Sequence, residues 1–231
     1  MTLIDLPPNP DGTAARGHLA LPPGGTGPGV LVIQEWWGLN PGIVEMADRL
    51  AAAGFVALAP DLYRGELAGH DEVDKAAELM TALPLDRAVA DMGNAVDALV
   101  AHPATTGSAI GVVGFCMGGM LTLVLAAARG DVVRAAVPFY GAPLGDAEPD
   151  WSGLTAVVRG HMAGNDDFFP ADAVRDLEAR LRAAGHDVRL EVHEGAGHAF
   201  MGPHDTFGTL DLALSDRLWP EVCAFLHAQL G

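Results

Sequence analysis

The strongest chemical signal in this 231-residue sequence is a cysteine set between glycines. Cys116 lies in the segment Gly-Phe-Cys-Met-Gly-Gly at 114–119, after the β-branched run at 110–113 and before an apolar helical pattern that ends at Ala128. This pattern predicts a buried strand, a sharp turn and a buried helix, with glycines where a Cβ would crowd either element. Because a helix N-terminus favours a thiolate, Cys116 is a candidate nucleophile on an elbow-shaped turn.

A purely structural role is the alternative for Cys116. A cysteine within an apolar run is most often an inert core residue, and the glycines could serve only to pack a strand against a helix. The other polar residues of the chain distinguish a catalytic from a structural role for Cys116, because an enzyme that uses a nucleophile normally supplies a base beside it.

Polar side chains that follow two later predicted strands supply a base and an acid. His198 ends a Gly-Ala-Gly-His segment after the last predicted strand, and the pair Asp166 and Asp167 follows the strand before it. A carboxylate that accepts a hydrogen bond from imidazole Nδ1–H fixes the tautomer of the base. The chain order of nucleophile, acid and base is that of an α/β-hydrolase triad. We favour Asp166 as the acid, with Asp167 as the alternative.

Two other histidines are weaker candidates for the base: His193 lies within a strand pattern, and His161 lies near a strand end. A zinc site is rejected because a helical His-Glu-x-x-His motif starting at His193 would need its second histidine at position 197, which is Gly197. The glycine segments match no nucleotide-binding fingerprint, so we expect neither a metal nor a cofactor.

Strand and helix alternate along the chain that must position these residues. Apolar runs without polar alternation are typical of strands covered on both faces, so the pattern predicts a mostly parallel, doubly wound α/β sheet with helices on both faces, in a single domain over 1–231. In such a sheet, chemistry lies at the carboxyl ends of the strands. The predicted strands are 16–21, 30–33, 55–59, 110–113, 135–139, 154–158 and 188–192. The predicted helices are 40–53, 71–83, 85–100, 120–128, 170–185 and one or two C-terminal helices with a break near Pro220.

Composition narrows the function class. A formal net charge of −17 argues against nucleic acid and anionic membranes as partners. The two cysteines, Cys116 and Cys223, predict no disulfide framework and suit a reducing compartment. No signal-peptide pattern is visible at the N-terminus, and no apolar run reaches the ~18 residues that span a bilayer. We expect a cytoplasmic monomer or small homo-oligomer that acts on a small molecule.

Five segments together resemble the dienelactone hydrolase (carboxymethylenebutenolidase) family, over nearly the whole chain and in the family's order. They are Gln-Glu-Trp-Trp-Gly-Leu at 34–39, Ala-Pro-Asp-Leu-Tyr at 59–63, the cysteine segment at 114–119, Gly-Asn-Asp-Asp-Phe-Phe-Pro at 164–170 and Gly-His-Ala-Phe at 197–200. The resemblance implies the α/β-hydrolase fold and a triad of Cys116, His198 and Asp166, because the family's acid stands four residues before the proline that is here Pro170. It also implies that Glu35 contacts the thiol in the resting enzyme and moves when substrate arrives.

The family's two substrate-binding arginines are not both matched. Arg64 directly follows Tyr63, one place earlier than in the family, and the second arginine's place, four residues after the catalytic histidine, is Gly202. We expect Arg64 to contact substrate, but the loss of one directional Arg–carboxylate contact should change the preferred substrate.

The resulting hypothesis is hydrolysis of an ester or lactone by the Cys116 thiolate, with the oxyanion between the backbone N–H groups of Trp36 and Met117. Aromatic residues that could line an apolar pocket, or be ordinary core, are Trp36, Trp37, Phe115, Phe168 and Phe200. Within the enzyme class, a general esterase or thioesterase is the alternative. Outside it, the alternatives are a hydrolase-fold protein that only binds a ligand and a redox sensor built on Cys116.

Overall fold

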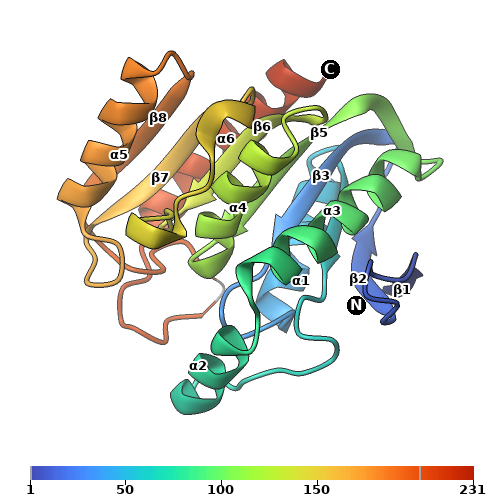
Figure 1. The fold of residues 1–231 in the computed structure, drawn as a ribbon, viewed down its shortest axis with the longest axis horizontal. Helices are drawn as coiled ribbons and strands as arrows, with labels where there is room; N and C mark the ends of the chain where they lie inside the picture. The colour runs from blue at the N-terminus through green and yellow to red at the C-terminus, as the bar shows by residue number, and fades with distance from the viewer. Residues whose placement is uncertain (1, 203) are drawn as a thin grey trace.

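The computed structural model describes residues 2–202 and 204–231, which form one eight-stranded sheet flanked by helices (Figure 1). The strands are β1 Leu3–Leu6, β2 Ala15–Ala20, β3 Gly27–Ile33, β4 Val56–Pro60, β5 Thr105–Phe115, β6 Val133–Phe139, β7 Val157–Asn165 and β8 Val188–Gly197. The helices are α1 Pro41–Ala52, α2 Val73–Thr81, α3 Leu85–Ala101, α4 Met117–Ala128, α5 Ala171–Ala183 and α6 Leu212–Leu230.

The sheet has the order β1-β2-β4-β3-β5-β6-β7-β8. Every pair from β4 to β8 is parallel, while β1 and β2 add antiparallel pairs at one side. The predicted mostly parallel α/β sheet is therefore confirmed. The strand predicted at 16–21 lies second from that side, not at the edge, because the short β1, which the sequence did not reveal, pairs with it.

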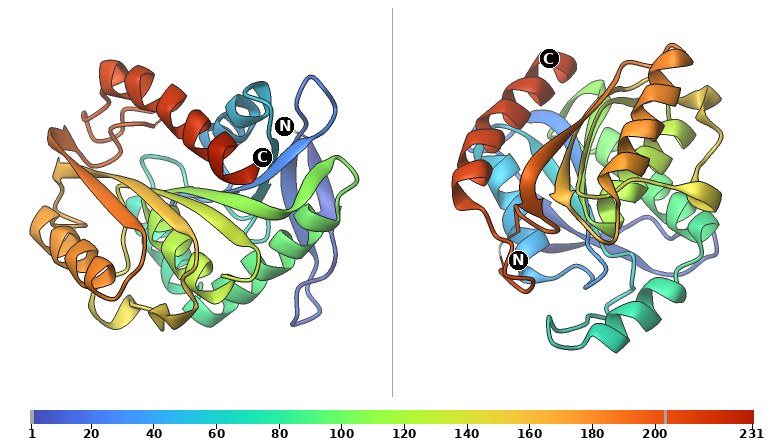
Figure 2. Two further views of the ribbon diagram at one scale, coloured as in Figure 1. Left: turned by 90° about the horizontal axis from the view of Figure 1, so that it is seen from above. Right: turned by 90° about the vertical axis from the view of Figure 1, so that its left-hand side faces the viewer.

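Helices cover both faces of the sheet, as Figure 2 shows: α1 and α6 on one face, and α3, α4 and α5 on the other. Alternate residues of a strand point to opposite faces, so in β3 Val30 and Val32 pack toward α1 and α6. Leu31 and Ile33 pack toward α3 and α4. The sequence analysis predicted that the unbroken apolar run at 30–33 is a strand covered on both faces, and the structure confirms this.

Two element predictions are wrong. The strand predicted at 154–158 is β7, which runs from Val157 to Asn165. Its glycines, Gly160 and Gly164, allow close packing against β8 and do not form a turn. A Cβ at Gly164 would lie 2.9 Å from the Glu194 Cα. The break expected near Pro220 is absent, since α6 continues through the proline. Buried Leu218 and Val222 hold both halves of α6 to the sheet.

No helix within 2–202 and 204–231 combines the length and the hydrophobicity needed to cross a bilayer.

The turn between β5 and α4 is built on glycines. Cys116 has φ 55° and ψ −119°, a left-handed conformation that a side chain rarely adopts. A Cβ on Gly118 would collide with the carbonyl oxygen of Ile33, and one on Gly114 with that of Gly118. These two glycines therefore let β3, β5 and α4 meet at the turn.

We expect Gly118→Ala to lower the free energy of unfolding by about 3 kcal/mol, measured by urea denaturation. Helix propensity alone would favour alanine there by about 1 kcal/mol, so a loss shows that the collision with backbone decides. Gly24→Ala is the matched control, since nothing lies within 4 Å of a Cβ there. Equal stability of the two variants would contradict the assignment.

Candidate active site

The polar residues of the predicted site lie where adjacent strands end. Cys116 directly follows β5, Asp166 follows β7, His198 follows β8, and Glu35 lies two residues beyond β3. Parallel strands bring these carboxyl ends to one edge of the sheet, which is where α/β proteins place their chemistry.

The Cys116 thiol lies at the N-terminus of α4, where the backbone N–H groups of Met117 and Trp36 are directed at its sulfur as hydrogen-bond donors. Burial, and after it the negative charge of Glu35, raises the pKa of this thiol well above its ordinary value, and the two N–H groups offset only part of that rise. The resting cysteine is therefore a neutral thiol. The expectation that the helix N-terminus favours a thiolate fails in this state, because desolvation of the sulfur outweighs the N–H donors.

His198 and Asp166 form a buried pair. His198 Nδ1 donates to Asp166 Oδ2 at 2.8 Å, and both side chains are buried. The other carboxylate oxygen, Oδ1, accepts from the backbone N–H groups of Phe168 at 2.9 Å and Phe169 at 3.1 Å. Asp166 is thus fixed from both sides and leaves His198 Nε2 free to act as a base. Asp167, the alternative acid, is exposed.

The structure does not join the thiol to the imidazole. Among the described residues no hydrogen bond links Cys116 and His198. The backbone N–H groups of Met117 and Trp36, which are expected to hold an oxyanion, both act on the thiol and lower its pKa.

Glu35 does not have the expected partner. Its carboxylate is buried, and Oε2 accepts a hydrogen bond from His204 Nε2 at 3.0 Å instead of from the thiol. After burial, the negative charge of Glu35 is the next cause of the raised pKa values of Cys116 and Tyr140. Sequence reasoning did not single out His204, which lies 169 positions from its partner.

Two aromatic side chains lie at the mouth of the site. Phe168 is 54% exposed, with its ring centroid 4.8 Å from that of His198, and Trp36 lies 6.2 Å from Phe168. Phe207, which the sequence analysis did not single out, lies 5.7 Å from His198 and 6.0 Å from Phe168. These rings form an uncharged rim over the histidine.

The other three aromatic candidates belong to the core. Trp37 is 1% exposed and packs against Ala68 and Ala76. Phe115 stacks on Phe139 under α6, and Phe200 is fully buried. A pocket-lining role for Trp37, Phe115 and Phe200 is therefore a wrong prediction, because each points into packed side chains.

Arg64 is also misassigned as a substrate contact. Its guanidinium pairs with Asp11 at 2.7 Å and with Asp91 at 3.3 Å, joining the N-terminal hairpin loop to α3. Its hydrogen bonds with these carboxylates raise the pKa of Arg64, so its charge is committed there. With Gly202 at the second position, neither expected arginine is available to a substrate carboxylate.

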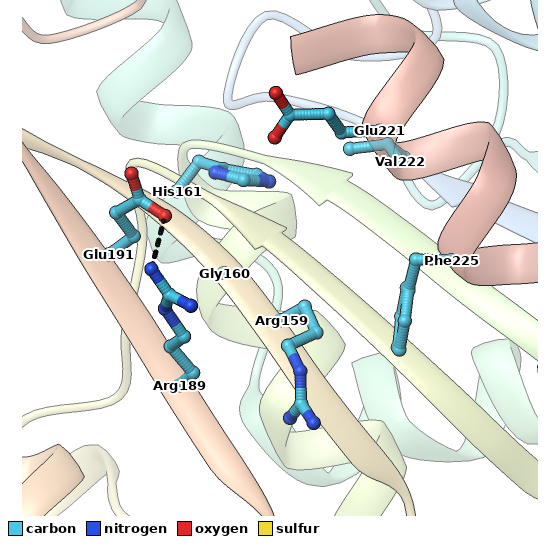
Figure 3. A pocket seen from close by; sticks show the side chains of 8 residues that line it. All are labelled: Arg159, Gly160, His161, Arg189, Glu191, Glu221, Val222 and Phe225. Carbon is cyan, nitrogen blue, oxygen red and sulfur yellow. Dashed lines mark hydrogen bonds and ion pairs between the residues drawn. The ribbon is translucent and has the colours of Figure 1, made fainter.

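His161, one of the two rival histidines, lines a pocket between β7, β8 and α6 (Figure 3). His161 Nδ1 lies 3.2 Å from His193 Nε2, and the rings stack. Glu191 and Glu221 flank His161 in this pocket. His161 and His193 thus pair with each other, and His198 is the histidine that a buried carboxylate orients.

His161 gives the protein a pH-dependent stability. Burial, with a smaller contribution from His193, lowers the pKa of His161 from 6.5 to about 3. Between these values the unfolded chain binds a proton that the folded chain does not, so the free energy of unfolding falls as pH falls. We expect His161→Gln to flatten this decline by up to about 1.4 kcal/mol per pH unit. Urea denaturation from about pH 6.5 to about pH 4.5 measures it, and parallel curves for both proteins would refute it.

Tyr140 is the most unusual residue that the sequence did not mark. It directly follows β6 with φ 36°, its side chain is fully buried, and its hydroxyl has no hydrogen-bond partner among the residues that the structure describes. Its ring packs edge-on against His198 at 5.3 Å. Burial, then Glu35 and Cys116, raise the pKa of this phenol, so it stays a neutral donor at the site.

In the part of the chain that the structure describes, no three His, Cys, Asp or Glu side chains are grouped as metal ligands. The site's own groups are a thiol, an imidazole–carboxylate pair and two convergent N–H donors. Such a set suits acyl transfer.

Known proteins resemble this chain along most of its length. The family model described as "Dienelactone hydrolase family" matches residues 15–230. Protein usf of Aquifex pyrophilus is 39% identical over 197 residues, which cover 83% of this chain and 84% of that protein. The carboxymethylenebutenolidase of a Pseudomonas species is 34% identical over 190 residues, 79% of this chain and 78% of that protein. A crystal structure of a dienelactone hydrolase-like promiscuous phosphotriesterase from metagenomic libraries superposes with a TM-score of 0.86 at 25% identity, covering 100% of this chain and 99% of that one.

Proposed function

This chain belongs to the dienelactone hydrolase family, with the α/β-hydrolase fold, and we propose that it hydrolyses ester or lactone bonds with Cys116 as nucleophile, His198 as base and Asp166 as the carboxylate that orients the base. The observation that carries the proposal is the buried Asp166–His198 pair, at 2.8 Å, on the sheet edge that also presents the elbow cysteine. This pair supports a base with a fixed tautomer.

Attack begins with movement of the sulfur. Substrate binding displaces the Cys116 thiol from between the N–H groups of Met117 and Trp36, and the carbonyl oxygen of the substrate takes that place. His198 Nε2 accepts the thiol proton while sulfur bonds to the carbonyl carbon. The oxygen becomes an oxyanion that accepts from both N–H groups, and losing one comparable donor costs about 3 kcal/mol of transition-state stabilisation in other enzymes.

Collapse of this intermediate breaks the bond to the leaving oxygen, which takes the proton from His198 and leaves a thioester on Cys116. In a lactone the leaving group stays tethered to the acyl chain. His198 then accepts a proton from water as the water attacks the thioester. The second intermediate expels the sulfur, which is protonated again, and the acid is released.

The preferred substrate should be uncharged near the rim of Trp36, Phe168 and Phe207. Arg64 is paired with two aspartates, position 202 is glycine, and Glu35 adds negative charge close to the thiol. A substrate carboxylate would therefore meet aromatic rings and a like charge, which favours neutral esters and lactones over dienelactone itself.

The test is a panel of p-nitrophenyl acetate and lactones with and without a free carboxylate, compared by kcat/KM. The proposal predicts turnover of the neutral compounds and no gain from the carboxylate. Absence of turnover for every compound contradicts hydrolysis, while a preference of tenfold or more for the carboxylate contradicts the neutral-substrate assignment.

A further inference from the structure

The unexplained contact at this site is the one between Glu35 and His204. Glu35 comes from the loop after β3 and His204 from the segment between β8 and α6, and the two side chains are 3% and 10% exposed. A buried carboxylate needs a hydrogen-bond donor or an opposite charge to remain ionised there. His204 supplies it at 3.0 Å.

His204 is itself held by neighbours. Its Nδ1 lies 2.9 Å from the Thr206 hydroxyl, which can donate to this nitrogen or accept from it. Its ring packs on His70, with ring centroids 3.9 Å apart. His70 in turn lies edge-on to the buried Trp37. The imidazole is thereby fixed with Nε2 toward Glu35, and this packing explains why Trp37 is core.

The groups that Glu35 would otherwise meet are the thiol and a phenol. The loop that carries Glu35 packs on the elbow, since a Cβ at Gly118 would lie 2.6 Å from the Gln34 carbonyl oxygen. After burial, the negative charge of Glu35 contributes to raising the pKa of the Cys116 thiol and of the Tyr140 phenol, and the Tyr140 hydroxyl has no hydrogen-bond partner among the described residues. A carboxylate released from His204 would be able to accept a hydrogen bond from either of these two donors. Accepting from the thiol would stabilise its protonated form and oppose attack.

We propose that His204 is a positioning residue for the nucleophile: by donating Nε2–H to Glu35 it holds that carboxylate off the Cys116 thiol and offsets its charge, so that the thiolate can form. This rests on the proposed function of Cys116. It differs from the expectation that Glu35 binds the thiol at rest, since here a group of the protein holds the carboxylate before substrate arrives.

The test is the rate at which iodoacetamide alkylates Cys116, followed as a function of pH by mass spectrometry of the intact protein and its peptides. The variants are His204→Gln, Glu35→Gln and the double variant, with Cys223→Ala in every background so that one cysteine reports. The titratable groups coupled to the thiol are Glu35, Asp166, Tyr63 and Tyr140, and those around His204 are His70, Asp71, Glu45 and Glu72.

His204→Gln should raise the apparent pKa of the thiol by about one unit and slow alkylation at neutral pH about tenfold. Glu35→Gln should speed alkylation, and the double variant should match Glu35→Gln within about twofold, because the carboxylate through which His204 acts is gone. His204→Lys, which supplies a donor that reaches Glu35 from the same position, should restore much of the rate. His102→Gln is the control, since His102 lies before β5 at the opposite edge of the sheet.

An unchanged alkylation profile in His204→Gln overturns the proposal. The proposal is also overturned if His204→Gln slows alkylation equally in the wild-type and Glu35→Gln backgrounds, because the substitution would then act by loosening the local structure and not through Glu35. If His204→Gln does not fold, the His204→Lys variant decides. An alkylation rate of His204→Lys that is no more than a tenth of the rate of His102→Gln would contradict the proposal. Alkylation of Cys116 does not require ester turnover. If the variants show the expected alkylation rates but the protein hydrolyses no ester or lactone, the proposed function is contradicted while the role of His204 is supported.

Discussion

Cys116→Ala is expected to lower kcat/KM for p-nitrophenyl acetate at least about 10⁴-fold. The thiol is the group at which the N–H donors of Met117 and Trp36 converge, and alanine offers no atom that can form the thioester. The fold should survive, because Cys116 is only partly buried and its strained backbone is retained by the surrounding glycines. Steady-state kinetics and thermal denaturation measure the two effects.

Cys223→Ala is the matched control for this change. Cys223 is also a free, partly buried cysteine, but it lies within α6 and not on the turn between β5 and α4. It should keep wild-type activity. Activity that survives Cys116→Ala, or that falls equally in both variants, would mean that the elbow cysteine is not the nucleophile.

Asp166→Asn is expected to lower kcat/KM about 10²- to 10⁴-fold with little change in stability. The asparagine oxygen can still accept from Phe168 and Phe169, which turns the amide NH₂ toward His198 Nδ1. Nδ1 must then accept a hydrogen bond, so the proton moves to Nε2 and the histidine can no longer act as a base. The pH dependence of kcat/KM reports this loss directly.

Asp167→Asn makes the same chemical change at the neighbouring position. Asp167 is exposed, so its replacement should leave kcat/KM within about twofold of the wild-type value. The reverse ranking of the two variants would assign the acid to Asp167, which sequence alone left open.

Local sequence patterns predicted the sheet and the elbow because the causes are local. The apolar runs of β3 and β6 need cover on both faces wherever they lie, and the spacing of Gly114 and Gly118 around Cys116 meets a requirement of the turn itself. The cap of α1 is of the same kind: Asn40, at the start of the helix predicted over 40–53, accepts from the Ile43 N–H at 3.0 Å.

The environment of the site was less predictable because it depends on long-range packing. Trp36 and Trp37 are adjacent, yet one lies at the rim and the other is 1% exposed beside His70. Arg64 has the right residue type near the right motif, but the N-terminal hairpin loop brings Asp11 to it. Glu35 meets His204 only because the segment before α6 folds over the end of β3. No local pattern encodes such meetings.

The proposed mechanism requires a covalent bond between the acyl group of the substrate and the Cys116 sulfur. Mixing the protein with p-nitrophenyl acetate, quenching in acid during turnover and mapping the acetyl group by mass spectrometry tests it directly. The account predicts one hydroxylamine-sensitive acetyl group on the peptide that contains Cys116, and none in Cys116→Ala. Turnover that continues with the acetyl group on another residue, or with Cys116 unmodified in a protein whose Cys116→Ala variant is equally active, would contradict it.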